Sequence, residues 1–260
     1  MHHAAAISRH TAPPARAMFR EPTGDVFELL QQHVPVKRRV MCEGERVHQV
    51  GQQLEWLHVV HSGSFMTVNL APDGREQAVG LHLKGDWLGF DGIAQGRHTC
   101  DAVAMDIGEL WSVSYAALLQ ASTRVPALAA VLHAAMSRVI TRERNAMMSM
   151  CTLPADARVA EFLRVWLESL SECGLRTDRI TLRMTRAEIG KYLGLTLETV
   201  SRAFSQLARA NVISFPEKGH RHLSITDADG LSRYVQRSQT AQEDSPRAAR
   251  PVGNQLCVVH

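Results

Sequence analysis

The chain of 260 residues lacks any apolar run near the roughly 20 residues that a membrane-spanning helix needs. Its first ten residues, MHHAAAISRH, contain no apolar signal-peptide core and are soon followed by two prolines. Cysteine is scarce and odd in number, and no two cysteines are close in sequence (Cys42, Cys100, Cys151, Cys173 and Cys257). This usage argues against a disulfide framework. We therefore expect a cytoplasmic protein with no membrane partner.

The motifs of common enzymes are also missing. The chain contains no Walker A loop, no nucleophile–base arrangement and no paired carboxylates. His58 and His61 are three residues apart in a strand-like run, so they point to opposite faces and cannot simply chelate one metal. A cupin-like enzyme, which needs clustered His and Glu ligands, is the rival that this spacing disfavours. The sequence thus predicts neither an enzyme nor a metal site.

The most informative stretch is TRAEIGKYLGLTLETVSRAFSQLARAN, from Thr185 to Asn211. Its apolar residues have helical spacing on both sides of Gly194, where a first helix must stop and the chain must turn. This pattern predicts a helix-turn-helix over about residues 186–205. Residues 176–222 contain nine basic and four acidic side chains, a surplus that favours a polyanionic partner.

The earlier part of the chain has a different sequence pattern. Between about residues 34 and 113, short apolar runs alternate with glycine-containing turns, which is typical of a small β-barrel or jelly roll. From residue 126 to 153 an uninterrupted helical pattern follows Pro126, which suits a first-turn position. One stripe of this helix predicts a coiled-coil seam between two copies of the chain, formed by Leu132, Met136, Ile140, Glu143, Met147 and Met150.

Glu143 is the one charged member of this seam. In a parallel homodimer it would approach its own copy, and like charges in a partly dry seam repel. It either pairs with a neighbouring arginine, Arg142 or Arg144, or it keeps the dimer weak until another interaction favours it.

After residue 153 the pattern is that of a winged helix-turn-helix. Pro154-Ala155-Asp156 is expected to break the long helix and to cap an amphipathic helix from Ala157 to Gly174. Two strand-like runs flank the basic segment PEKGHR as a wing, and a closing helix reaches Gln236. The expected α+β organisation is an arm (1–23), a β-roll resembling a cyclic-nucleotide-binding jelly roll (24–125), a dimerisation helix (126–153), a DNA-binding domain (154–236) and a disordered tail (237–260).

This order of elements resembles the Crp/Fnr transcription regulators. HLKGDWLGFDGI (82–93) is similar to a corner segment of the FNR branch, and MTRAEIGKYLGLTLETVSRAFSQL (184–207) to that branch's helix-turn-helix. Glu198, Ser201 and Arg202 match the E-x-x-S-R of its recognition helix. The resemblance covers about residues 24–236 and implies a two-fold DNA site with half-sites like TTGAT.

The chemistry of the triplet is consistent with that role. Positions 198, 201 and 202 share one helix face, where arginine can grip guanine O6 and N7 and glutamate can accept from cytosine N4. We predict base contacts for Glu198, Ser201 and Arg202. Predicted DNA-backbone contacts are Arg186, Lys191, Thr196 and Thr199, with Thr196 also capping the recognition helix.

The signal stays open at this stage. An iron–sulfur cluster of the FNR type is disfavoured, because residues 1–41 contain no cysteine and Trp111 stands at the position of the roll ligand. Cyclic nucleotide is disfavoured because GFDGIAQGRHT (89–99) offers only Arg97 and Thr99, and Asp91 would repel a phosphate. Haem remains open, since several of the 13 histidines fall in the roll, among them His48, His58, His61, His82 and His98. Thiol oxidation at Cys100 or Cys151 is a further alternative.

The expected function is that of a homodimeric, sequence-specific regulator of transcription that responds to an environmental or redox signal. In the family, activators dominate and contact RNA polymerase through exposed loops of the roll, for which Ala71–Glu76 is the candidate here. The alternative is a ligand- or haem-binding roll that acts as a repressor.

Overall fold

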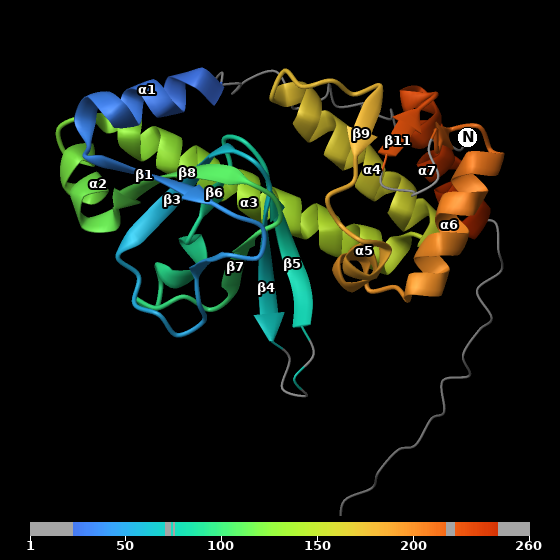
Figure 1. Cartoon of the computed structure of the whole chain (residues 1–260), viewed down its shortest axis with the longest axis horizontal. Coiled ribbons are helices and arrows are strands. Elements are labelled where there is room, and N and C mark those ends of the chain that lie inside the picture. Colours follow the sequence, from blue (N-terminus) through green and yellow to red (C-terminus); the bar gives the residue numbers. More distant parts are fainter. Residues whose placement is uncertain (1–22, 71–73, 75, 217–221, 244–260) are drawn as a thin grey trace, which may run out of the picture.

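The computed structural model describes residues 23–70, 74, 76–216 and 222–243. Figure 1 shows a β-roll at one end, a group of helices at the other, and one long helix running between them. None of the helices in these ranges is long and apolar enough to cross a lipid bilayer. The predicted arm lies outside the described residues, except for Thr23.

The β-roll consists of two four-stranded antiparallel sheets, with strand orders β1-β8-β3-β6 and β2-β7-β4-β5. The bounds of its strands and short helix are β1 (Val36–Met41), β2 (Arg46–His48), β3 (Trp56–Ser62), β4 (Phe65–Leu70), β5 (Glu76–His82), β6 (Trp87–Leu88), the 3-10 helix η2 (Phe90–Gly92), β7 (Asp101–Ala104) and β8 (Gly108–Ser114). Val60, Phe65 and Leu110 are among the apolar side chains buried together in one cluster of the roll. The predicted jelly roll is confirmed.

Helices cover one sheet of the roll from outside. They are α1 (Thr23–His33), α2 (Tyr115–Ser122) and the first half of α3 (Pro126–Thr152). Phe27 of α1 and Leu128 of α3 belong to one apolar cluster with Val59 and Trp111 of the sheet. Trp111 therefore has a packing role, with its ring centroid 5.0 Å from that of Phe27.

Helix α3 is fixed to the roll by a charged pair as well. The guanidinium of Arg142 donates two hydrogen bonds to the carboxylate of Asp86, at 2.7 and 2.9 Å, and a third to the carbonyl of Leu81 at 3.1 Å. Such a two-pronged pair fixes orientation as well as distance. Arg142 is thus engaged by the roll, and the predicted alternative in which it pairs with Glu143 is wrong.

The C-terminal domain contains α4 (Ala155–Glu172), β9 (Arg179–Thr181), α5 (Arg186–Leu193), α6 (Leu197–Arg209), β10 (Ile213–Ser214), β11 (His222–Ile225) and α7 (Ala228–Glu243). Strands β10, β11 and β9 form a small antiparallel sheet beside the helices. The predicted wing is therefore confirmed as a β10–β11 pair, while its tip, 217–221, lies outside the described residues.

Two predicted boundaries in this domain are wrong. Helix α4 begins at Ala155 with Pro154 at its N-cap, so Asp156 lies in its first turn and does not cap it. The Asp156 carboxylate instead accepts a hydrogen bond of 2.6 Å from the hydroxyl of Tyr234 on α7, a partner that no local pattern reveals. Helix α7 runs on through residues 237–243, so the predicted disordered tail does not begin at residue 237.

Candidate nucleic-acid interface

The two helices of the predicted helix-turn-helix are α5 and α6. Thr185 caps α5 in a reciprocal pair with Glu188, and Gly194 ends it in the left-handed conformation with φ 65°. A Cβ atom at Gly190 would lie 2.6 Å from the carbonyl oxygen of Leu195, so only glycine allows the chain to turn this closely. The turn that positions α6 therefore depends on two glycines and one capping box.

Helix α6 separates its apolar and polar faces sharply. The Thr196 hydroxyl accepts a hydrogen bond from the Thr199 amide at 3.2 Å, which confirms Thr196 as its N-cap. Its inner face is fully covered and consists of Val200, Ala203, Phe204 and Leu207. The helix is thus held by its apolar side, and the opposite side is left for contact with a partner.

The three predicted base-contacting residues lie on that opposite side. Glu198 and Arg202 are exposed, and Ser201 is half-buried. The guanidinium of Arg202 makes one long hydrogen bond, 3.4 Å, to the Thr199 hydroxyl. An exposed helix face that presents an acidic and a basic side chain one turn apart is suited to contacting the edges of nucleobases in a major groove.

The predicted backbone contacts differ from one another in their surroundings. Thr196 and Thr199 lie at the exposed start of α6, with their hydroxyl oxygens 2.9 Å apart. Arg186 is half-buried, and its guanidinium lies 4.9 Å from the ring centroid of Phe204 and 5.5 Å from that of Phe215. Burial lowers the pKa of Arg186. Arg186 therefore has a packing role, and its phosphate contact stays a prediction.

Lys191 reaches the β-roll. Its ammonium lies 3.3 Å from the carboxylate of Glu76 on β5, and the side-chain amide of Gln77 donates to its backbone carbonyl. A second ion pair, 3.0 Å long, joins Arg183 to Asp106 of the roll. Sequence reasoning missed both acids, because the partners are far apart in the chain and their local patterns carry no signal of the contact.

The predicted dimer seam divides into two parts. Leu132 is buried and Met136 is half-buried in this chain's own cluster against the roll. Ile140 and Met147 are 55% and 59% exposed, Glu143 is exposed and Met150 is half-buried. Only the part of the stripe from Ile140 onward is therefore free for a second copy, and the assignment of Leu132 to the seam is corrected by its burial in this chain's own core.

In the loop 89–99, where a cyclic nucleotide would place its phosphate, backbone amides are already hydrogen-bonded to a side chain of the same loop. The Asp91 carboxylate accepts hydrogen bonds from the backbone amides of Thr99 at 2.7 Å and Cys100 at 3.3 Å. Arg97 donates to the carbonyl of Gly51 at 2.8 Å. An anion at this loop would compete with Asp91 for the same amides.

The cysteines in the described residues are free thiols in different environments. Cys42 and Cys151 are exposed, Cys173 is half-buried and Cys100 is buried. Burial and the neighbouring Asp91 raise the pKa of the Cys100 thiol, so its reactive thiolate form is suppressed. Of the two predicted oxidation sites, only Cys151 is accessible.

Comparison with known proteins agrees with this architecture. Residues 157–234 match the Crp-like helix-turn-helix domain, and residues 38–124 match the cyclic nucleotide-binding domain. The transcriptional regulatory protein btr of Bordetella pertussis is 33% identical over 201 residues, which cover 77% of this chain and 82% of btr. The fumarate and nitrate reduction regulatory protein of Salmonella typhimurium is 27% identical over 196 residues, 75% of this chain and 77% of that protein.

A solved structure of a related protein has the same architecture. FixK2 from Bradyrhizobium japonicum superposes with a TM-score of 0.68 at 26% identity, covering 77% of this chain and 97% of FixK2. The matched domains, the identity to btr and the exposed face of α6 together mean that the chain belongs to the Crp/Fnr family and is a DNA-binding regulator of transcription.

Proposed function

We propose that the protein binds a two-fold DNA site as a homodimer and reads each half-site with α6. The observation that carries this proposal is the exposed pair Glu198 and Arg202 on a helix whose other face is fully buried. Arg202 would take guanine O6 and N7, Glu198 would accept from cytosine N4, and Ser201 would contact a base edge or a neighbouring group. Half-sites like TTGAT are the first sequences to test.

The test is fluorescence-anisotropy titration of a labelled duplex with two inverted TTGAT half-sites. We expect Arg202→Ala to lose about 1–3 kcal/mol and to relax the preference at a single base pair of the half-site. Arg209→Ala, an exposed arginine in the last turn of the same helix, is the matched control and should keep the full preference. An equal loss of affinity on all sequences with Arg202→Ala would contradict base readout.

Phosphate contacts have a different signature. Lys191→Ala should weaken binding to every sequence alike, and the slope of affinity against salt should become shallower by about one unit. This salt titration separates Lys191 from Arg202 in the same assay.

The dimer would form along α3. Exposed Ile140 and Met147 lie one on each side of Glu143, so a second copy of the helix would cover apolar side chains that this chain leaves open. In that seam the two Glu143 carboxylates would repel. Glu143→Ala should therefore tighten the dimer in sedimentation velocity and raise DNA affinity without a signal. Asn145→Ala, exposed on the same helix, is the control, and equal dimer affinity of Glu143→Ala and wild type would refute the repulsion.

The regulator would act in the cytoplasm as an activator that contacts RNA polymerase. Of the candidate loop Ala71–Glu76, only Gly74 and Glu76 lie within the described residues, and Glu76 ends it beside Lys191. In vitro transcription from a promoter carrying the two-fold site distinguishes the roles: transcript should rise with added protein, and a fall would indicate a repressor.

A further inference from the structure

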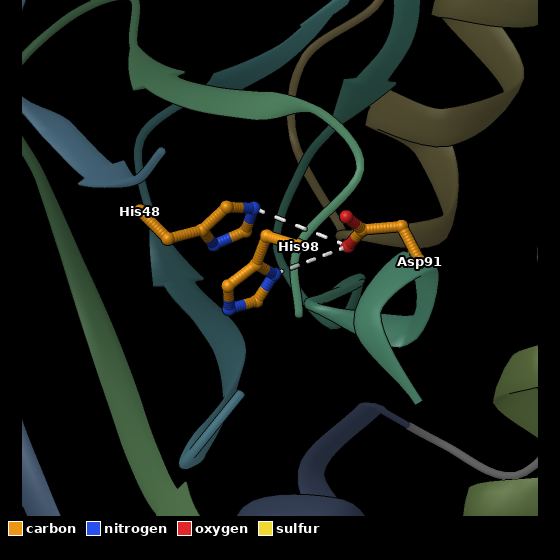
Figure 2. A group of neighbouring side chains, drawn as sticks. All are labelled: His48, Asp91 and His98. Atoms are coloured by element: carbon orange, nitrogen blue, oxygen red, sulfur yellow. Dashed lines mark hydrogen bonds and ion pairs between the residues drawn. The ribbon is translucent and has the colours of Figure 1, made fainter. Parts of the chain in front are cut away.

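Three metal-ligating side chains from separate segments meet inside the β-roll. Figure 2 shows His48 from β2, Asp91 from η2 and His98 from the loop before β7 around a common point. The Asp91 Oδ1 atom lies 3.4 Å from His98 Nδ1 and 4.0 Å from His48 Nε2. One ligand atom from each of the three residues lies within 4.8 Å of the other two.

No hydrogen bond accounts for the burial of His48. It is 2% exposed, and neither of its ring nitrogens has a hydrogen-bond partner. His58 and His82 each have a partner at one ring nitrogen, since His58 Nδ1 lies 2.7 Å from the Ser112 hydroxyl and His82 Nε2 lies 3.2 Å from the Thr67 hydroxyl, although His82 Nδ1 has none. Buried polar groups normally have a partner, so a bare imidazole that faces a carboxylate points to a ligand.

The carboxylate is oriented for such a ligand. Its Oδ2 atom accepts the backbone amides of Thr99 and Cys100, which leaves Oδ1 to face the two imidazoles. Burial would raise the pKa of Asp91, but the His98 hydrogen bond and the Thr99 amide hold this pKa below its usual range. Burial lowers the pKa of His48 to about 4. The cluster therefore turns one carboxylate oxygen and a His48 ring nitrogen without a hydrogen bond toward the same point.

We infer that His48, Asp91 and His98 form a binding site for one divalent transition-metal ion. Two imidazoles and one carboxylate are the ligand types that suit zinc, iron, cobalt and nickel, whereas calcium and magnesium take oxygen ligands. Three protein ligands leave further positions for water or a small molecule. This inference goes beyond the proposed DNA binding by α6, because it assigns a metal ligand to the β-roll.

Binding requires a small local rearrangement. The rings of His48 and His98 are stacked, with centroids 3.6 Å apart and planes within 8°. Lone pairs in parallel planes cannot both meet one ion at about 2.0–2.1 Å, so at least one imidazole must rotate out of the stack. Binding therefore requires a change in the orientation of at least one of the two rings and disrupts their stacking.

The test uses the full chain without an added histidine tag, stripped with a chelator and titrated with Co²⁺ alone. We expect one ion per chain by calorimetry, visible ligand-field absorption, and a rise in melting temperature with added Co²⁺. His48→Phe keeps the ring volume and removes the ligand atom, so its Co²⁺ affinity should fall by at least about tenfold and its melting temperature should no longer respond. His98→Gln tests the same ion through another segment and should have the same effect.

Two controls locate the ion. His133→Phe, exposed on α3, and the double variant His2→Ala/His3→Ala should bind Co²⁺ as wild type does. Stoichiometric binding that survives in both His48→Phe and His98→Gln, or that disappears in either control, would place the ion elsewhere and overturn the inference. Failure of the wild-type chain to bind Co²⁺ at all would overturn it equally, while leaving DNA binding by α6 untouched.

Discussion

Among the described residues, the β-roll buries polar side chains, whereas the side chains buried in the DNA-binding domain are apolar. In the described ranges, the buried polar side chains are His48, His58, Ser64, Thr67, His82, His98 and Ser112, all of them in the roll. The C-terminal core around Phe162, Phe204 and Leu207 contains none among its described residues. Burying a polar group lowers the free energy of unfolding unless the group is paired. The polar interior therefore makes the roll less stable than an apolar core like that of the other domain would.

This difference matches the division of work proposed above. A domain that only presents a helix to DNA needs a rigid support, and an apolar core of close-packed side chains supplies one. A domain that responds to a signal needs groups whose state can change, and buried imidazoles are such groups. The contrast can be tested first in the apolar core, then in the polar one, and finally at the contact between them.

The largest effect is expected from Phe204→Ala in the apolar core. Phe204 is fully buried, packs edge-on to Phe215 with ring centroids 5.9 Å apart, and supports the guanidinium of Arg186. Removing the ring should lower the free energy of unfolding by about 3–5 kcal/mol. Hydrogen exchange of the α6 amides measures this locally, and the loss should be the same at pH 5 and pH 8.

Ser205→Ala is the matched control for this loss. Ser205 is the next residue along α6, and it is exposed. The change should alter stability by less than about 0.5 kcal/mol. A Phe204→Ala loss that grows steeply at low pH would mean that the C-terminal core depends on titrating groups, and the contrast would fail.

The polar interior should be sensitive to acid. Burial lowers the pKa of His82 from its ordinary 6.5 to about 4. Between these values the unfolded chain binds the proton and the folded roll does not, so the free energy of unfolding falls as the pH drops from about 6.5 toward 4. His82 alone accounts for about 2–3 kcal/mol of this fall. Its contribution to the free energy of unfolding is fully present above pH 6.5.

His82→Gln removes the titrating ring and keeps a polar side chain near Thr67. The variant should show a shallower fall in stability of the roll between pH 6.5 and 4.5, measured by hydrogen exchange of β4 and β5 amides. Exchange of α6 amides in the same samples should follow the same pH course in both proteins. An unchanged acid profile of β4 and β5 would show that His82 does not remain neutral in the folded roll.

The two regions also differ in how far their sequence predicts them. The helix-turn-helix is marked by Thr185, Gly194 and Thr196, whose signals lie within one short stretch and act on adjacent backbone. Helical periodicity likewise predicts α3, although it cannot tell that Leu132 is covered by the chain's own roll. Local signals are therefore sufficient to predict the helix-turn-helix.

The interior of the roll depends on pairings that local patterns do not encode. His48, Asp91 and His98 come together because β2, η2 and the loop before β7 meet in the folded roll. Alternating apolar residues indicate strands, but their register and neighbours are set by packing over the whole domain. For this reason the sequence indicates that several histidines lie in the roll but not which of them are neighbours, and it predicts no metal site.

The smallest effect concerns the contact between the regions. Lys191, a predicted phosphate contact, is paired with Glu76 of β5, and both side chains are about half exposed. An exposed pair of this kind contributes about 0–1 kcal/mol, and DNA must displace Glu76 before the ammonium can reach a phosphate. Glu76→Gln should therefore raise affinity for all duplexes by up to about fivefold, in anisotropy titrations at low salt.

Glu76→Gln in a Lys191→Ala background isolates this contact. The gain should disappear there if it arises from release of the ammonium, because the double variant then differs from Lys191→Ala only at a residue without its partner. A gain that persists would come from the loss of a negative charge near the duplex, which acts on every basic side chain of the domain. In that case the Lys191–Glu76 ion pair would not couple the roll to α6, and any signal from the polar interior would have to reach α6 through α3 or through other contacts between the domains, such as the Arg183–Asp106 ion pair.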